Sequence, residues 1–249
     1  MRYSKHILFA LGIIAFQVSS LLAQASSGSA APRLRFLFLD ESPGAYYVST
    51  DGQQKELISS GPFVISSPYK PSRSMPLQIY KELADPLTGI IRKLPVARVI
   101  PPAETSSAIV IVSPRPRENP EAELDYQVEV INADADVFPS GTIGVINRAE
   151  VAMAAQFGDK QIALLPGETK IVHPSTDARY RYFSRVAART ENGWKAVSDT
   201  ISVVRPQERI IGIFVYSPSG MRNTYTAAEI EEFGPPKPGN FWLTFSDTP

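Results

Sequence analysis

Short apolar stretches separated by turns dominate the pattern of this 249-residue chain. Tyr126–Val130 alternates apolar and polar residues, which indicates a strand with one face on a core and the other in water. Residues 34–39, 108–112 and 210–216 are apolar at nearly every position, which is typical of short strands covered on both faces. Turns rich in proline and glycine separate these stretches. The pattern predicts an all-β protein with a sandwich architecture.

A hairpin over residues 179–204 is the most clearly specified element. Its turn is Asn192-Gly193, because these residue types best tolerate the positive φ angles of a two-residue loop. Such a loop pairs Arg185 with Thr200. One face then carries mostly apolar residues: Tyr182, Val186, Ala188, Val197, Ile201 and Val203. The turn and the apolar pattern agree on this register, so we expect that face to be buried.

The opposite face of the hairpin is the strongest candidate for a binding site. It carries Arg181, Arg185 and Arg189 at strand spacing, with serine and threonine across from them and Trp194 diagonal to Arg189. The guanidinium groups could hold an anion through charge-assisted hydrogen bonds, and the indole could stack on a sugar. The alternative is a solvated face whose arginines are neutralised by acidic residues of a neighbouring strand.

Residues 1–25 have the features of a secretory signal. Arg2 and Lys5 precede the apolar run 7–16, and Ala23-Gln24-Ala25 is a small-residue cleavage site. Removing this segment lowers the number of basic residues from 25 to 23 against 25 acidic ones, so the mature charge is −2. We therefore expect an exported protein, periplasmic or secreted, with no nucleic acid held by bulk charge.

The chain contains no cysteine, so disulfides, a lipoprotein anchor and Cys/His zinc sites are excluded. Stability must then come from a hydrophobic core, for which roughly 220 mature residues suffice. No segment after the signal is apolar over a length that could cross a membrane. These observations predict a protein without a transmembrane segment in the mature chain.

Composition divides the mature chain into three parts: a β-rich domain at 33–117, a β-sandwich domain at 122–217, and a C-terminal extension at 218–249. Prolines interleaved with charges between Ser113-Pro114 and Tyr126 suggest the linker, and Tyr126 would open the second domain. A strand ending in Ser-Pro closes each domain, at Ser113-Pro114 and Ser217-Pro218, so two related modules remain an open alternative. The extension should form a short helix over 227–233 and a strand over 241–245 that docks back.

Residues 126–190 resemble the immunoglobulin-like modules of exported bacterial proteins. The resemblance rests on the strand 128–132, the turn Leu165-Pro166-Gly167-Glu168 and the aromatic strand Tyr180-Arg181-Tyr182. It covers about a quarter of the chain. It implies two immunoglobulin-like β-sandwich domains with a short C-terminal helix and tail. Periplasmic pilus chaperones also have two such domains, although they place this pattern in the first one.

Catalytic and metal-binding patterns are weak. A Ser-His-Asp triad could use only His173 in the mature chain, and its place at a strand end favours an ordinary histidine. Asn132, Asp134 and Asp136 have the spacing of a calcium loop, but Val137 and Ile143 occupy its glycine and glutamate positions, so a polar turn is favoured. Paired carboxylates for glycoside hydrolysis are not testable from spacing along the sequence.

These observations favour an exported, non-enzymatic β-sandwich protein that binds or scaffolds a protein or polysaccharide of the cell envelope, without cofactor or metal. Arg181, Arg185, Arg189 and Trp194 are the candidate binding residues. One alternative is an envelope hydrolase that uses carboxylates. Another is a periplasmic chaperone or assembly factor that pairs an edge strand with a client.

Overall fold

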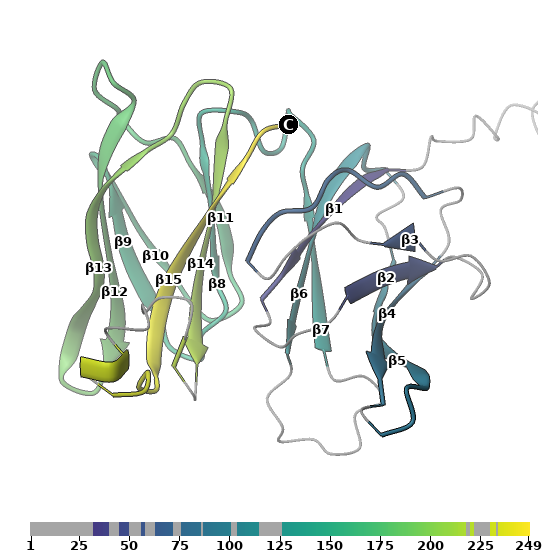
Figure 1. Ribbon diagram of the computed structural model, residues 1–249. Helices are drawn as coiled ribbons and strands as arrows, with labels where there is room; N and C mark the ends of the chain where they lie inside the picture. Colours follow the sequence, from purple (N-terminus) through teal and green to yellow (C-terminus); the bar gives the residue numbers. More distant parts are fainter. Residues whose placement is uncertain are drawn as a thin grey trace, which may run out of the picture. The chain divides into compact units, whose positions relative to one another are not determined.

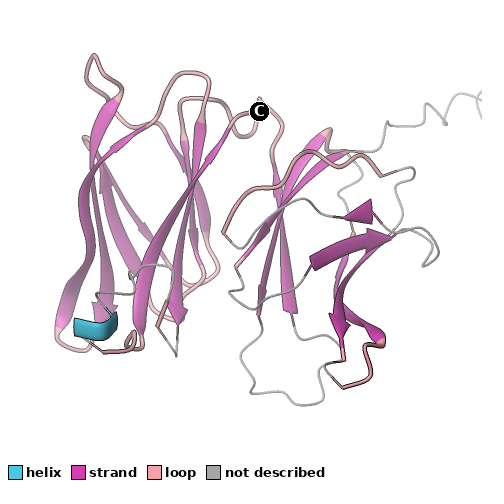
Figure 2. Ribbon diagram, viewed as in Figure 1, coloured by secondary structure: helices cyan, strands magenta, loops and turns pink. Residues whose placement is uncertain are grey.

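The computed structural model of the chain consists almost entirely of β-strands (Figures 1 and 2). It describes residues 32–39, 45–49, 56–57, 63–71, 76–85, 87–100, 104–114, 126–217, 220–221, 230–232 and 234–249. In these ranges no helix is long and apolar enough to cross a membrane. The all-β architecture predicted from the apolar pattern is confirmed. The predicted signal at 1–25 lies outside the described residues.

The first half of the chain forms two sheets that face each other. Its strands are β1 (Arg33–Phe38), β2 (Ala45–Ser49), β3 (Glu56–Leu57), β4 (Leu77–Ala84), β5 (Ile91–Val99), β6 (Ser107–Pro114) and β7 (Tyr126–Asn132). One sheet has the order β1-β6-β7 and the other β3-β2-β4-β5. A cluster of buried side chains from both sheets fills the space between them. We call this unit the first sandwich.

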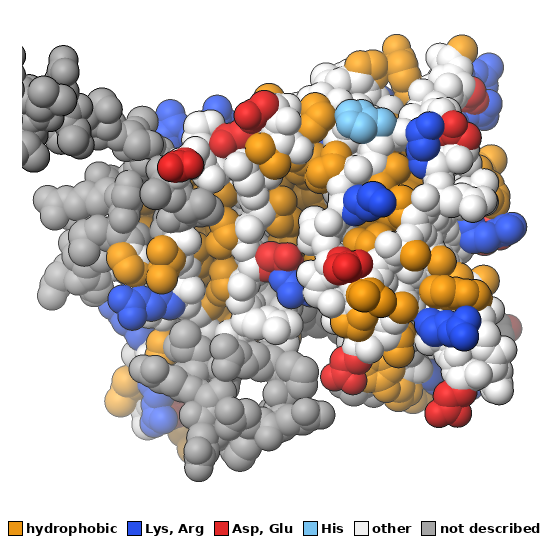
Figure 3. All heavy atoms as spheres, turned by 180° about the vertical axis from the view of Figure 1, so that it is seen from behind, with side chains coloured by type: hydrophobic (Ala, Val, Ile, Leu, Met, Phe, Trp, Pro, Cys, Tyr) orange, Lys and Arg blue, Asp and Glu red, His pale blue; other side chains and the backbone are white. Residues whose placement is uncertain are grey.

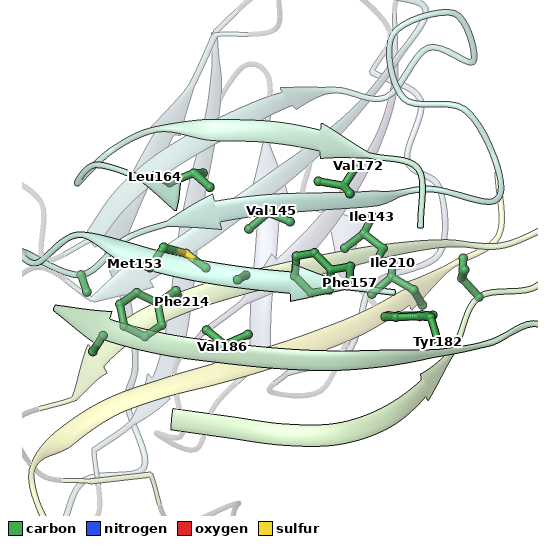
Figure 4. Close-up of a cluster of buried hydrophobic side chains, with 14 residues drawn as sticks. Ile143, Val145, Met153, Phe157, Leu164, Val172, Tyr182, Val186, Ile210 and Phe214 are labelled. Carbon is green, nitrogen blue, oxygen red and sulfur yellow. The ribbon is translucent and has the colours of Figure 1, made fainter. Parts of the chain in front are cut away.

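The second half of the chain forms another pair of sheets. Its strands are β8 (Ile143–Asn147), β9 (Met153–Phe157), β10 (Lys160–Leu164), β11 (Thr169–Val172), β12 (Arg181–Thr190), β13 (Gly193–Val203), β14 (Arg209–Ser217) and β15 (Gly239–Asp247). The sheets have the orders β11-β8-β14-β15 and β10-β9-β12-β13. Their facing apolar side chains, among them Met153, Phe157, Val186 and Phe214, form the core of this second sandwich (Figure 4).

The two sandwiches have the same topology. In the first, β1 runs parallel to β6 and β6 is antiparallel to β7, as β8, β14 and β15 pair in the second. The sheet β3-β2-β4-β5 corresponds strand by strand to β10-β9-β12-β13. Residues 65–69 bridge to β1 in the antiparallel sense, as β11 pairs with β8. The fold is therefore an internal repeat of one eight-segment unit. The Ser-Pro pairs at Ser113-Pro114 and Ser217-Pro218 occur at the ends of the corresponding strands β6 and β14, in agreement with the alternative of two related modules.

A β-bulge at the same place in both repeats supports this correspondence. The β4–β5 register shifts between Ile79 and Tyr80, which leaves Val96 unpaired. The β12–β13 register shifts between Val186 and Ala187, which leaves Val197 unpaired. A bulge adds one residue to one strand and so bends and twists the ladder. In both hairpins the extra, unpaired residue is a valine of the second strand.

The boundary between the sandwiches differs from the one that composition suggested. β7 starts at Tyr126, which we expected to open the second domain, but it pairs with β6 along its whole length. The proline-rich stretch between them therefore joins two antiparallel neighbours of one sheet, and residues 115–125 lie outside the described residues. The change of sheet comes at residues 133–142, between β7 and β8. A proline-rich composition marked a connection but not a domain boundary.

A third buried cluster joins the sandwiches, which belong to one compact unit, Ala31–Pro249. Its members come from the second faces of the sheets that contain β1 and β14, and include Leu37, Ile109, Ile111, Ile146, Ile211, Ile213, Leu243 and Phe245. This explains why residues 34–39, 108–112 and 210–216 are apolar on both faces. Each of these strands contributes to an internal core on one side and to the joining cluster on the other.

A buried ion cluster lies beside this joint. Asp247 accepts hydrogen bonds from Arg209 Nε at 2.6 Å and from Arg35 Nη1. Arg209 is 0% exposed, and its Nη1 also donates to the carbonyl oxygens of Ala133 and Phe138. Three strands, β1, β14 and β15, are therefore held together by one carboxylate.

The C-terminal extension follows the prediction where it is described. Residues 230–232 are helical, and Gly234 has φ +83° and donates its N–H to the carbonyl of Ile230, which is the expected glycine cap. The remaining residues of the predicted helix lie outside the described part of the chain. β15 pairs with β14 as an edge strand, so the predicted docking of the apolar tail is confirmed.

Candidate functional site

The β12–β13 hairpin exists, but its turn differs from the predicted one. Thr190 pairs with Gly193, so the two loop residues are Glu191 and Asn192 rather than Asn192 and Gly193. Gly193 is the first residue of β13 and has φ +110°. With this turn and the bulge at Val197, the register departs from the predicted one along the whole hairpin.

The faces of β12 were predicted correctly, whereas those of β13 were predicted only in part. Tyr182, Val186 and Ala188 are buried, and the three arginines are exposed on the opposite side. Ile201 and Val203, however, pair with Phe183 and Arg181 and are 68% and 39% exposed. A shift of one residue moves every following side chain to the other face of a strand, and the register change does this to the far half of β13.

The predicted binding residues do lie on one surface, the side of sheet β10-β9-β12-β13 that faces away from the core. Arg181, Arg185, Arg189 and Trp194 all point outward there, and Trp194 is 50% exposed. Arg189 is directly opposite Trp194, and its guanidinium carbon lies 5.5 Å from the centre of an indole ring. We call this surface the outer face.

Two of the three arginines are neutralised. Arg185 forms an ion pair with Asp199, which lies opposite it on β13, at 2.8 Å. Arg181 forms one with Asp177 at 2.7 Å, and its hydrogen bond lowers the pKa of Asp177 to about 2. Arg185 is therefore neutralised from the neighbouring strand, as the alternative had it, and Arg181 from the turn before β12. Arg189 has no carboxylate partner among the described residues and instead contacts the indole of Trp194.

A row of four alanines crosses the outer face at right angles to the strands. Successive pairings place Ala163 opposite Ala154, Ala154 opposite Ala187, and Ala187 opposite Ala196. Directly paired residues point to the same side of a sheet. At strand spacings of 4.7–4.9 Å, the four positions form a strip about 14 Å long that is floored by methyl groups. We call this strip the alanine row.

Taller polar and aromatic side chains border the alanine row. On one side, successive pairings align Gln161, Gln156, Arg185 and Asp199 across the same four strands. On the other side stand Arg189 and Trp194. Beyond Arg185 and Asp199, the next pair on the outer face is Phe183 with Ile201. The Arg185 guanidinium carbon lies 5.1 Å from the centre of the Phe183 ring. The strip thus combines a flat floor with amide, guanidinium and aromatic groups at its edges.

The first sandwich shows that this flat floor is not required by the fold. The pair Tyr80–Pro95 follows the bulge in the β4–β5 hairpin just as Ala187–Ala196 follows it in β12–β13. Tyr47 pairs with Tyr80, and their rings stack with centres 5.7 Å apart. At three of the four corresponding positions the first sandwich therefore has bulky residues where the second has alanine.

The other sequence candidates are His173 and the segment from Asn132 to Asp136. His173 is exposed directly after β11. Asp134 accepts hydrogen bonds from the Ser106 and Ser107 amides and from the Ser106 hydroxyl, which lowers its pKa. Asp134 thus connects the turn after β7 to the residues at the start of β6. No cluster of three metal-ligating side chains occurs among the described residues.

The described carboxyl groups give no support to acid catalysis. Those whose pKa departs from its ordinary value all have it lowered by hydrogen bonds: Asp85, Asp134, Asp159 and Asp177. A glycosidase needs one carboxyl whose pKa is raised so that it stays protonated.

The edge strands β5 and β13 are poor templates for a client strand. β5 contains Pro95, and both β5 and β13 carry the bulges. Proline cannot donate to a ladder, and bulges twist an edge away from further pairing.

Sequence reasoning missed the alanine row and its glutamine border. Alanine is abundant at 152–155, but the alignment of four alanines depends on three strand pairings that the sequence does not display. Charges are scattered over the face shown in Figure 3, where basic and acidic side chains are interspersed.

A comparison with models of known protein families and with curated protein sequences finds no match.

Proposed function

We propose that this chain is an exported, non-enzymatic binding protein of the cell envelope that holds a polysaccharide on the outer face of its second sandwich. The alanine row is the observation that carries the proposal. Four small side chains in line allow a flat polymer to approach the sheet closely. Nothing in the topology demands them, since Tyr47, Tyr80 and Pro95 occupy corresponding positions of the first sandwich.

The groups around the row suit a sugar chain. Sugars present apolar C–H faces and hydroxyl edges in alternation. The exposed indole of Trp194 supplies a flat apolar surface, and the amides of Gln156 and Gln161 can both donate and accept hydrogen bonds. Arg189, which lacks a carboxylate partner within the described residues, can bind an acidic group on the chain.

The direction of the row favours a polysaccharide over a peptide strand. The row runs across the strands, and a peptide lying along it would cross them rather than pair with them. Strand addition uses the edge of a sheet, where main-chain groups are free. The edges β5 and β13 are interrupted by bulges, which makes these two strands unsuitable for such an addition.

Co-sedimentation with insoluble polysaccharides tests this proposal, with peptidoglycan, cellulose and an insoluble acidic polysaccharide as probes. We expect the protein to be retained by at least one of them. The variant A154Q/A187Q, which fills the row, should lose about tenfold or more in affinity, as should Trp194→Ala. Thr200→Gln is the matched control, because Thr200 is exposed on the same hairpin but pairs with buried Ser184 on the other side.

Three results would count against the proposal. The protein could be retained by none of the polysaccharides, or the row-filling variant could bind as well as the wild type. Release of reducing sugar from the bound polymer would instead indicate the hydrolase alternative. Melting temperatures of all variants should match the wild type, because every substituted side chain is at least partly exposed.

A further inference from the structure

The hairpin of the first sandwich ends in an apolar tip. Leu87 is 95% exposed, Ile90 and Ile91 are each 62% exposed, and Leu94 is 44% exposed. Leu87 and Ile90 lie in the turn between β4 and β5, and Ile91 and Leu94 lie in the first residues of β5 (Figure 1). Isolated exposed apolar side chains are ordinary, but a group of them at one projecting turn marks a contact surface.

The repeat provides an internal comparison for this tip. The corresponding turn of the second sandwich joins β12 to β13 through the polar residues Glu191 and Asn192. Both hairpins share topology and a bulge, so the fold accepts a polar turn at this place. Folding therefore does not account for the apolar residues of the β4–β5 tip.

The described N–H groups of the tip already donate to internal hydrogen bonds. Leu87 and Thr88 donate their N–H groups to the Asp85 carboxylate, and Gly89 donates to the Asp85 carbonyl. Asp85 in turn donates to the Ile90 carbonyl, and Ile90 to the Thr88 hydroxyl at 3.3 Å. A turn whose N–H groups are paired can leave water at little cost, whereas unpaired amides would oppose its transfer into hydrocarbon.

Basic side chains lie one step behind the apolar end. Arg92 is 71% exposed along its side chain and reaches Asp85 at 3.3 Å, and Lys93 lies beside the Tyr80 ring. Asp85 pairs with Arg92 and Glu82 lies opposite Lys93, so each of these two cations has an acidic neighbour. Apolar residues at the end and cations behind them are the arrangement found where proteins sit in the headgroup region of a bilayer.

We propose that the β4–β5 tip inserts into the interfacial region of a lipid bilayer. Leu87, Ile90 and Ile91 enter the acyl boundary, and Arg92 and Lys93 contact lipid phosphates. This anchoring is independent of polysaccharide binding, since the tip and the alanine row belong to different sandwiches.

Vesicle sedimentation tests the insertion, with phosphatidylcholine vesicles and with vesicles that also contain phosphatidylglycerol. The wild type should partition onto both. L87S/I90S should lose about tenfold or more in partitioning. Leu165→Ser is the matched control, because Leu165 is 61% exposed at a turn of the other sandwich and should bind as the wild type does.

A direct reading of depth comes from Leu87→Trp. Its emission should shift to the blue on addition of vesicles and be quenched by lipids brominated on the acyl chain. The proposal fails if the wild type does not partition, if L87S/I90S and Leu165→Ser bind alike, or if the Leu87→Trp emission is unchanged. A tip-dependent dimer in sedimentation velocity without vesicle binding would assign the tip to a second copy and also overturn it. Polysaccharide retention should be the same for L87S/I90S as for the wild type, which separates this test from the previous one.

Discussion

Removing the carboxylate of Asp247 should destabilise this protein more than removing any exposed carboxylate. Asp247 is 3% exposed and lies between the guanidinium groups of Arg35 and Arg209. Burial is the main reason that the pKa of Arg35 is lowered, and the nearby charge of Arg209 adds to it. Asp247→Ala would leave two buried cations facing each other without a counter-charge. Breaking a buried pair in this way costs about 3–5 kcal/mol.

Asp199→Ala is the matched control, because Asp199 also faces an arginine. In the Arg185–Asp199 pair the side chains are 54% and 46% exposed, so water and salt screen their attraction. Removing such a pair costs about 0–1 kcal/mol. Urea unfolding followed by circular dichroism measures both free energies of unfolding.

Arg209 cannot swing out to water, because its Nη1 is also bound to two carbonyl groups. We therefore expect Asp247→Asn, which keeps the shape of the side chain and an acceptor oxygen, to lose less stability than Asp247→Ala. Equal losses for Asp247→Ala and Asp199→Ala would refute the reasoning and would mean that water reaches the cluster.

Three further predictions concern the β12–β13 hairpin. Replacing Arg181, Arg185 and Arg189 together by Gln should change the free energy of unfolding by no more than about 1 kcal/mol per ion pair, and a larger loss in urea unfolding would show that the outer face is buried. Gly193→Val should lower the free energy of unfolding by about 1–2 kcal/mol, because φ at this position is +110°. An added Cβ would contact no other atom, so the loss would come from backbone strain alone, and an unchanged melting temperature would contradict it. The Asp177 carboxyl should titrate near pH 2 by NMR, below its ordinary pKa of 3.8. Its stabilising contribution is therefore present above about pH 4 and is lost as the pH falls toward 2. A titration midpoint near pH 4 would disprove the pairing with Arg181.

The sequence predicted those features that depend on one strand at a time. Alternation along β12 placed Arg181, Arg185 and Arg189 on one side regardless of their partners. The apolar tail at 241–245 and the cap at Gly234 were likewise local patterns. Hydrophobic period and turn chemistry are properties of a short window, and such a window is all that these features require.

Features that depend on pairing could not be predicted in the same way. The bulge at Val197 inserts one residue whose side chain is ordinary for a strand, so the sequence offers no sign of it, and the far half of β13 was assigned to the wrong face. The alanine row needs three registers to be known at once. The ion cluster did leave a signal, since Arg35 interrupts an apolar run, but its partner lies 212 positions away.

The repeat makes it possible to separate what the fold needs from what a surface adds. Both sandwiches keep the parallel pair, the hairpin and the bulge with its unpaired valine, and these are the features that set the register and twist of the sheets. They differ at the row beside the bulge, which is aromatic in one and alanine in the other, and at the hairpin tip, which is apolar in one and polar in the other. A feature that one copy lacks is not needed to fold the other. Within the described residues, the alanine row of the second sandwich and the apolar tip of the first are therefore features that the shared fold does not require, which is why we propose each of them as a contact surface.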